Sequence, residues 1–482
     1  MNIQLDDLTR RLSALAGGEA RRALETRPSA SIHDLPSEIL LMIFRQLHIM
    51  KDVEPFDIES PSVFPHAVST VCQTWQHVMT MAPEFWTQVA EFIDDPWVGA
   101  SLDSQLQWSK GLMFEATITY RNPVQDTWDG SAGWRENNQR MKSALTALIP
   151  HITRCTALDI LVDNSVYLPS LVRDLPSAPK LDRLHFLSHD DGAKMSFTWP
   201  SKSFNQCPLP EFPQLRSLSL DGNNFMAVML SGLTWLFGIS QLSVGPFIQQ
   251  TRPQDRFPTH LFFMALMQMP NLYDLTIFRM DFTPLENTVT SVPLVTLESL
   301  SLRFLTKEAL EVVFTMIDSD DMTSFFRLAI TSCELEDLRN VHMPTVDRLA
   351  ISDIDFWDDS GVAFVAEFHG DDLTLDNCSA FADSLLNSMT VRNANGRFGC
   401  CDTRHLVVRG AKYLSVELFQ ELVKQRNEGH ITKGPDGLAQ EPTTPYPLHV
   451  LTTLEVSGSG IALSEAQETW FKQRVLHFQW EQ

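Results

Sequence analysis

The sequence has few cysteines, and their spacing fits neither a zinc finger nor a disulfide framework. The 482-residue chain contains seven, with no CxxC pair to hold zinc and no even set of the kind that small secreted domains use. They lie at positions 72, 155, 207, 333, 378, 400 and 401. We therefore expect reduced thiols in a cytoplasmic or nuclear protein.

Positive charge is also in short supply. The 37 lysines and arginines stand against 60 aspartates and glutamates, which gives a formal net charge of -23. Such a surface repels phosphate backbones and anionic lipid headgroups. Nucleic acid and membranes are therefore poor candidates for the main partner.

Long apolar runs are missing as well. The strongest run, LFFMALM at 261–267, is far shorter than the roughly 20 residues needed to cross a bilayer. The opening MNIQLDDLTRRLSAL carries acids and arginines where a secretory leader needs an apolar core. The sequence thus predicts neither a transmembrane helix nor export.

Signatures of catalysis are absent from the sequence. It contains no GxSxG elbow, no phosphate-binding glycine loop and no HExxH metal pair. CCDTRH at 400–405 could be a Cys/His nucleophile pair, but adjacent cysteines at the start of a repeat strand favour packing. The acidic clusters IDSDD at 317 and DIDFWDD at 353 lack the spacing of a calcium loop, so we interpret them as turns. We expect no catalytic residue, no cofactor and no metal.

The first hundred residues read as short amphipathic helices. Leucines at 5, 8, 12 and 15 predict one such helix within an N-terminal helix-and-linker segment, 1–30. Another begins near Pro36 in DLPSEILLMIFRQL at 34–47, and a third follows the apolar stripe of VSTVCQTWQHV at 68–78. APEFW at 82–86 ends that helix and adds two aromatic anchors. A core made by two or three such helices is marginal alone, so we expect this unit to lean on a partner.

These segments, in this order, resemble an F-box. An F-box opens on Leu-Pro-x-Glu, continues through an Ile/Leu-rich helix and a Val-Cys-x-x-Trp helix, and closes on Leu-Trp or Phe-Trp. The resemblance covers 31–95 and departs from the usual pattern at 48–67, where a short turn is expanded. It implies binding to the Skp-type adaptor of a cullin-RING ubiquitin ligase, and through it to a cullin. The positions that it assigns to adaptor binding are Leu35, Pro36, Glu38, Ile39, Ile43, Phe44, Leu47, Cys72, Trp75, Pro83 and Trp86.

The rest of the chain, 96–482, repeats a short motif: apolar, two variable residues, apolar, one variable, apolar. Examples are LRSLSL at 215, LESLSL at 297 and LTTLEV at 451. Many copies are separated by intervals near the roughly 20–29 residues of leucine-rich repeats. Each L-x-L predicts a short strand, and HLFFMALMQM and LTKEALEVVFTMI predict return helices. The middle residues of the motif, which we call the anchors, are Leu158, Leu184, Leu218, Leu242, Leu275, Leu300, Leu328, Leu349, Leu373, Leu406 and Leu454.

This array resembles the degenerate leucine-rich-repeat domains that follow F-boxes, as in the large F-box families of mushroom-forming fungi. The expected fold class is α/β: a small all-α F-box followed by an irregular leucine-rich-repeat solenoid with a curved parallel sheet. GLMFEATITY at 111–120 should supply an earlier strand, and 427–447 a mobile loop insertion. SEAQETWFKQRVLHF at 464–478 should form a C-terminal capping helix.

Alternate strand residues should line the concave face of such a sheet. The residues that directly follow the anchors, which we call the row between the anchors, should be exposed there. They are Asp159, His185, Ser219, Ser243, Thr276, Ser301, Ala329, Ala350, Thr374, Val407 and Glu455. The residues that directly precede the anchors form a second exposed row, the preceding row, which includes side chains of both charges. From the two rows, the candidates for binding a target protein are Arg183, His185, Asp274, Arg327, Arg348, Asp372 and His405, although each could also be ordinary solvated strand surface.

Two classes of function remain open. The first is a substrate receptor that docks the adaptor through the F-box and holds a target protein on the repeat arc. The second is a leucine-rich-repeat scaffold that keeps an F-box-like cap without recruiting a ligase, which the expansion at 48–67 favours. An enzyme with a divergent α/β fold is a distant third, and would need a pocket with strongly perturbed titrating groups.

Overall fold

The computed structural model describes two compact units. One comprises residues 1–89 with 104–114, and the other 90–103 with 115–482. The helix expected within 1–30 and most of the 48–67 expansion lie outside the residues that the structure describes. Those residues are 32, 35–51, 65–95, 98–120, 132–190, 210–232, 234–247, 256–284, 296–317, 325–338, 341–391, 398–410, 412, 414–428, 432–433, 439–440 and 450–482.

Short helices build the smaller unit. They are α3 (Ser37–Lys51), α4 (His66–Ser69), α5 (Gln73–Met81) and the 3-10 turn η2 (Pro83–Trp86). The carbonyl of Pro36 accepts the N–H of Leu40 at 3.1 Å, so the proline lies one position before the helix rather than at its first residue. Glu38 places negative charge in the first turn, where it opposes the helix dipole.

The core of this unit is aliphatic and aromatic. Phe44 of α3 meets Trp75 of α5 edge-on, with 5.1 Å between the ring centroids. The indole N–H of Trp86 donates to the carbonyl of Met79 at 3.0 Å, and its ring lies 4.5 Å from that of Trp108. The fully enclosed residues are Leu40, Phe44, Val78, Met79, Ala82, Phe85 and Trp86.

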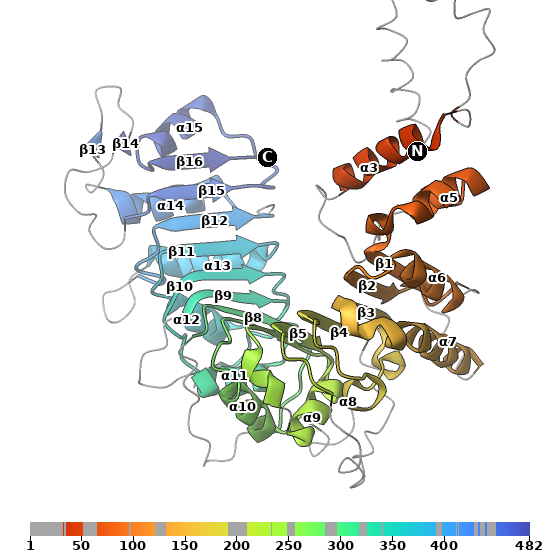
Figure 1. Cartoon of the computed structure of the whole chain (residues 1–482). Helices are drawn as coiled ribbons and strands as arrows, with labels where there is room; N and C mark the ends of the chain where they lie inside the picture. The colour runs from red at the N-terminus through yellow and green to blue at the C-terminus, as the bar shows by residue number, and fades with distance from the viewer. Residues whose placement is uncertain are drawn as a thin grey trace, which may run out of the picture. The chain divides into compact units, whose positions relative to one another are not determined.

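One 14-stranded parallel sheet, alternating with helices, makes the chain an α/β protein. Strand order in the sheet follows chain order, with β12 beside β15 because the short strands β13 (Thr432–Lys433) and β14 (Ala439–Gln440) pair separately (Figure 1). The strands are β1 (Gln88–Phe92), β2 (Phe114–Thr119), β3 (Cys155–Asn164), β4 (Arg183–Asp190), β5 (Ser217–Leu220), β6 (Gln241–Val244), β7 (Asp274–Phe278), β8 (Ser299–Arg303), β9 (Phe325–Thr331), β10 (Val346–Ser352), β11 (Asp372–Asp376), β12 (His405–Arg409), β15 (Thr453–Val456) and β16 (His477–Trp480).

Helices connect most of these strands. Two of them, α10 (Thr259–Met267) and α11 (Lys307–Ile317), confirm the return helices predicted from the sequence, and β2 confirms the early strand predicted within 111–120. None of the helices that the structure describes is long and apolar enough to cross a membrane. The helices are α6 (Ala100–Trp108), α7 (Ala132–Leu148), α8 (Leu171–Asp174), α9 (Gly222–Ser231), α10 (Thr259–Met267), α11 (Lys307–Ile317), α12 (Asp359–Ala366), α13 (Ser379–Thr390), α14 (Val416–Asn427) and α15 (Glu465–Lys472), with 3-10 turns η3 (Ile149–Arg154), η4 (Ser165–Tyr167) and η6 (Thr234–Gly238).

The register of the sheet confirms the anchor prediction. Leu349 pairs with Leu328 on one side and with Leu373 on the other. The same ladder runs from Leu158 through every anchor and ends at Phe478 of β16. Each anchor leucine is at most 2% exposed. Because side chains alternate along a strand, this buried ladder fixes which residues face away from the helices.

Strands β7 to β11 all end in the same turn, although different residues build it. The residue after each strand has a φ between 47° and 54°; these residues are Arg279, Phe304, Ser332, Asp353 and Asn377. Its N–H donates to the last strand carbonyl of the next repeat, as from Phe304 to Thr331 at 2.9 Å. Left-handed backbone costs a residue with a side chain about 1–2 kcal/mol. The bond between repeats offsets part of that cost.

The C-terminal end differs from the predicted capping helix. Ser464 does cap α15, in a reciprocal capping box with Gln467, but the helix ends at Lys472. The chain then forms β16, which pairs with β15. Phe478 occupies the next anchor position and stacks on Phe471 at 4.7 Å. The alternation of HFQW therefore favours a strand over continued helix.

The predicted loop at 427–447 is described only in part. Asn427 still belongs to α14. A short antiparallel hairpin follows, formed by β13 (Thr432–Lys433) and β14 (Ala439–Gln440). Glu428 ends α14 as its C-cap, and the other residues of the predicted loop lie outside the described part of the chain.

A buried carboxyl group lies near the start of the larger unit. Glu91 of β1 is 2% exposed, and it accepts the backbone N–H of Gly99 at 2.8 Å. Burial raises the pKa of Glu91 from 4.5 to about 7, although hydrogen bonds from Gly99 and Ser101 limit the rise. The folded chain therefore holds this carboxyl group mainly protonated below about pH 7.

We expect Glu91 to make folding weaker as the pH rises. Between about pH 5 and pH 8 the carboxyl group of Glu91 loses its proton in the folded state, whereas in the unfolded state it is already largely ionised at pH 5. The free energy of unfolding therefore falls by about 2–3 kcal/mol over this range. A Glu91→Gln variant keeps an acceptor for Gly99 without the charge, so it should lack this loss. Urea unfolding at both pH values measures the difference. The same pH dependence in both proteins would contradict the assignment.

Candidate functional site

Helix α3 is apolar on two faces, and one of them is uncovered. Ile39, Ile43 and Leu47 are 42%, 37% and 42% exposed, and their spacing of four places them along one side of the helix. Met42 and Ile49, which are 65% and 59% exposed, widen the same side. We call these five residues the α3 stripe. The opposite side of the helix packs into the core described above.

A helix on the surface of a globular protein normally hides its apolar side chains on one face. A second, contiguous apolar face exposed to solvent is typical of a protein–protein contact. The helix that carries it is held by its other face, where Leu40 and Phe44 are enclosed in the core. Arg45 also donates through Nε and Nη2 to Glu84 Oε1 of η2 at 3.1 and 3.0 Å. The α3 stripe is therefore a candidate docking surface on a fixed support.

The residues predicted to bind an adaptor lie in two environments of the smaller unit. Phe44 and Trp86 are 1% and 0% exposed, and Leu35 and Trp75 pack against the same core. These four hold the helices together. Facing solvent are Pro36, Glu38, Ile39, Ile43 and Leu47, whereas Cys72 and Pro83 are half-buried.

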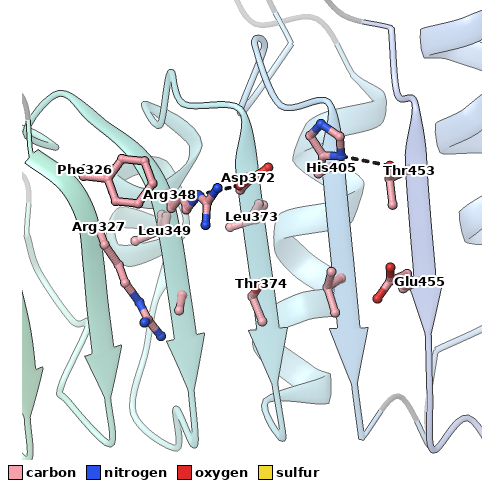
Figure 2. A pocket seen from close by; sticks show the side chains of 12 residues that line it. Phe326, Arg327, Arg348, Leu349, Asp372, Leu373, Thr374, His405, Thr453 and Glu455 are labelled. Carbon is pink, nitrogen blue, oxygen red and sulfur yellow. Dashed lines mark hydrogen bonds and ion pairs between the residues drawn. The ribbon is translucent and has the colours of Figure 1, made fainter. Parts of the chain in front are cut away.

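The second candidate surface is the open face of the sheet, the strand face opposite the helices (Figure 2). The register confirms the rows expected there, since Arg348 pairs with Arg327 and Asp372, and Asp372 with His405. Exposure differs from the prediction at two positions of the row between the anchors. Asp159 and Ser219 are only 3% and 5% exposed.

Asp159 is enclosed because Arg183 and His185 of the neighbouring strand cover it. Its carboxylate lies 3.1 Å from Arg183 Nη2 and 2.9 Å from His185 Nδ1. Burial alone would raise the pKa of Asp159, but the hydrogen bonds and charges of His185 and Arg183 outweigh it, and the pKa lies below its usual value. Arg183 also bonds Glu115 at 3.1 Å. Its guanidinium is thus committed to partners within the chain.

A groove of about 420 Å³ crosses the open face between β9 and β15. Four of the predicted target-binding residues line it: Arg327, Arg348, Asp372 and His405. Figure 2 shows Arg348 between Asp372 and the ring of Phe326, with its Nε 2.8 Å from the carboxylate and its guanidinium carbon 4.5 Å from the ring centroid. The groove therefore combines charged, aromatic and hydrogen-bonding groups.

A smaller hollow of about 180 Å³ lies on the same face between β4 and β7. It brings together His185 and Asp274, two further predicted residues, with Ser217, Ser219 and Gln241. Burial raises the pKa of Asp274 and the charge of Arg327 limits the rise. Arg183, the remaining prediction, lines neither the groove nor this hollow.

Apart from the anchors Leu349 and Leu373, two residues that line the groove escaped the sequence-based prediction. Phe326 lies outside both rows, yet its ring is 48% exposed and packs on Arg348. Thr453 does belong to the preceding row, and its hydroxyl lies 2.8 Å from His405 Nδ1. A comparison of all repeats position by position would have found Thr453, because it pairs with His405 in the sheet.

The segment CCDTRH pairs its side chains differently from the Cys/His pair considered above. Cys400 is fully enclosed, and burial raises the pKa of its thiol to about 12, far from the thiolate that a nucleophile requires. His405 bonds Thr453 instead of a cysteine. The sulfur of Cys401 lies 3.3 Å from Nδ1 of His369, a residue of the preceding repeat.

The sequence matches no protein-family model, and no curated protein sequence matches it. Function is therefore inferred from the two surfaces described here and from the resemblance of the sequence motifs.

Proposed function

We propose that the protein is a substrate receptor of a cullin-RING ubiquitin ligase, a cytoplasmic or nuclear protein without catalytic residues of its own. In this proposal the smaller unit is an F-box that binds a Skp-type adaptor, and through it a cullin. The larger unit is an irregular leucine-rich-repeat solenoid that holds a target protein. The observation that carries the proposal is the α3 stripe, an apolar helix face that nothing in the described part of the chain covers.

The α3 stripe supports adaptor binding by its position within the motif. Three of its members, Ile39, Ile43 and Leu47, are positions that the F-box resemblance assigns to the adaptor, and all three are more than a third exposed. Burying such side chains against a partner is favourable by about 25 cal/mol for each Å² of apolar surface removed from water. The motif residues that are enclosed, Phe44 and Trp86, supply the support instead.

The open face supports target binding. Its groove holds a cation–aromatic pair, Arg348 with Phe326, and an uncovered arginine, Arg327, beside acidic and hydroxyl groups. Aromatic and arginine side chains are the residues that most often dominate protein–protein affinity. Binding a target beside the ligase would raise its effective concentration for ubiquitin transfer by other subunits.

The alternative is a repeat scaffold that recruits no ligase. The feature that favours it is the expansion at 48–67. Helix α3 runs into this expansion as far as Lys51, and α4 begins only at His66. Adaptor binding in solution separates the two proposals.

We expect the triple variant Ile39→Ser/Ile43→Ser/Leu47→Ser to lose adaptor binding by at least about 100-fold, because several central apolar contacts are removed at once. These side chains are outside the core, so the circular dichroism and the unfolding midpoint should stay near those of the wild type. Isothermal titration with a purified Skp-type adaptor measures the affinity.

The matched control is Met264→Ser/Met267→Ser on α10, whose side chains are 52% and 63% exposed on the larger unit. This variant removes exposed apolar surface from a helix elsewhere and should bind the adaptor as the wild type does. A folded wild-type protein without measurable adaptor binding would replace the receptor proposal with the scaffold. Equal losses in both variants would show that the stripe is not the contact.

A further inference from the structure

Three side chains with metal-binding atoms converge beside the sheet, at the edge where β11 and β12 begin. His369 lies between α12 and β11, and Cys401 and Asp402 lie in the turn before β12. His369 and Asp402 occupy equivalent places in neighbouring repeats, because each lies four residues before an anchor leucine and the anchors Leu373 and Leu406 pair in the sheet. The sheet register therefore brings them together.

The spacing of the three atoms fits a tetrahedral zinc ion. His369 Nδ1 is 3.3 Å from Cys401 Sγ and 3.1 Å from Asp402 Oδ2, and the sulfur is 3.5 Å from that oxygen. Zinc bonds of about 2.3 Å to sulfur and about 2.0–2.1 Å to nitrogen or oxygen, at tetrahedral angles, separate S from N or O by about 3.5 Å and N from O by about 3.4 Å. The three ligand atoms already lie close to one face of that tetrahedron.

Hydrogen bonds with neighbouring helices fix the turn that carries Cys401 and Asp402. The buried guanidinium of Arg426 in α14 donates to the carbonyls of Gly399, Cys400 and Cys401 at 2.6, 3.2 and 3.0 Å. The N–H of Cys400 also donates to Ala366 O at the end of α12, at 2.8 Å. Binding a metal here would require little rearrangement of the backbone, which favours affinity.

The segment that carries His369 is fixed as well. Gly370, the next residue, passes so close to the start of β10 that an added Cβ would lie 2.2 Å from the carbonyl oxygen of Val346. The hydroxyl of Thr403 donates to the carbonyl of Gly370 at 3.5 Å, which joins the two ligand-bearing segments. Both sides of the cluster therefore rest on buried backbone.

We propose that His369 Nδ1, Cys401 Sγ and Asp402 Oδ2 bind one Zn²⁺ ion. A set of one nitrogen, one sulfur and one carboxylate oxygen suits zinc and not Mg²⁺ or Ca²⁺, which prefer oxygen alone. Cys401 is 4% exposed, whereas the side chains of His369 and Asp402 are 52% and 28% exposed. The fourth coordination position thus faces solvent and is open to water. Such an ion would join two successive repeats, whereas the sequence alone predicts no metal.

The test uses the full chain, treated with chelator, reduced, and titrated with Co²⁺, which adopts the same geometry as zinc and reports it by colour. We expect one equivalent of Co²⁺ to give the visible bands of a tetrahedral ion and a thiolate-to-cobalt charge-transfer band, both displaced by one equivalent of Zn²⁺. Cys401→Ser should abolish the charge-transfer band. His369→Gln and Asp402→Asn should each weaken binding by more than about 100-fold, since even the loss of an outer partner costs about 10–100-fold.

The matched control is Cys400→Ser, which removes the neighbouring buried thiol, whose sulfur contacts the carbonyl of Val365 at 3.4 Å instead. It should keep the charge-transfer band. His369 and Asp402 carry the exposed side of the cluster, so their variants test the proposal even if Cys401→Ser fails to fold. A wild-type chain that takes up no stoichiometric Co²⁺, or one whose spectrum is unchanged in His369→Gln and Asp402→Asn, would overturn the site and leave a hydrogen-bonded cluster.

Discussion

Replacing Arg426 with methionine is expected to lower the free energy of unfolding of the larger unit by about 3–5 kcal/mol. Arg426 is 2% exposed, and its guanidinium donates to three successive carbonyls of the turn before β12. It also lies over the ring of Phe398, 5.1 Å from the centroid. Methionine fills much of the space but has no donor, so the three carbonyls lose their hydrogen bonds from the guanidinium, although the carbonyl of Cys400 keeps the N–H of Thr403 at 3.2 Å. Each buried carbonyl left without a donor costs about 1–3 kcal/mol.

Two comparisons isolate this effect. Lys424→Met changes an exposed cation two residues earlier on the same helix, and it should shift stability by less than about 0.5 kcal/mol. Arg426→Lys keeps the charge but cannot reach three carbonyls in a fork, so it should fall between methionine and the wild type. Chemical denaturation followed by far-ultraviolet circular dichroism gives the three values. A loss below about 1 kcal/mol in Arg426→Met would show that the turn does not depend on the guanidinium.

Trp86→Ala is expected to destabilise the smaller unit by about 3–5 kcal/mol, enough to unfold it at room temperature. Trp86 is fully enclosed, its indole bonds the carbonyl of Met79, and its ring packs on Trp108. A unit with so few helices has little stability to lose. Hydrogen exchange read by mass spectrometry should show rapid exchange in α5 and η2, while the strands from β3 onward stay protected.

The matched variants for Trp86 separate packing from the hydrogen bond. Trp86→Phe keeps an aromatic ring but removes the indole donor, and the carbonyl of Met79 keeps only the N–H of Ala82 at 3.3 Å. The lost hydrogen bond should therefore cost about 0.5–1.5 kcal/mol. Met42→Ala truncates a side chain that is 65% exposed on α3, and exchange in the unit should stay at the wild-type rate. Slow exchange in α5 of Trp86→Ala would contradict the assignment of this residue to the core.

The repeat register could be predicted because its signal is carried by side chains of one kind. A leucine that recurs in L-x-x-L-x-L specifies both a strand and the face that it buries. The ladder from Leu158 to Leu454 is therefore readable from spacing alone, and so are the two rows on the open face. The termination of the array by β16 was missed because Phe478 replaces leucine at the anchor position.

The turn after each strand could not be predicted from composition. Arg279, Phe304 and Ser332 share left-handed backbone and a bond to the next repeat, but their side chains have no chemistry in common. The turn is specified by the backbone hydrogen bond, which the neighbouring repeat supplies. The residue types at these positions therefore do not indicate the turn.

The candidate sites also contain some features that the sequence predicts and others that it does not. Exposure of Ile39 and Ile43 on α3 follows from a helix with more apolar positions than one buried face can hold, which the sequence displays. The burial of Asp159 does not follow, because it depends on Arg183 and His185 closing over it from the neighbouring strand. Counting back four residues from each anchor would have paired His369 with Asp402. That inference needs the pairing of Leu373 with Leu406, which lie 33 residues apart in the sequence.

The agreement between strand order and chain order has a consequence for synthesis on the ribosome. From β3 to β12 each new strand docks on the one translated just before it, so no strand must wait for a distant segment to emerge. Parallel sheets usually fold slowly because their pairings are far apart in sequence. Here the nascent chain can enclose each anchor leucine as translation proceeds, at about 5–20 residues per second. During translation, the apolar surface that is not yet covered by a following repeat is then never larger than that of one repeat.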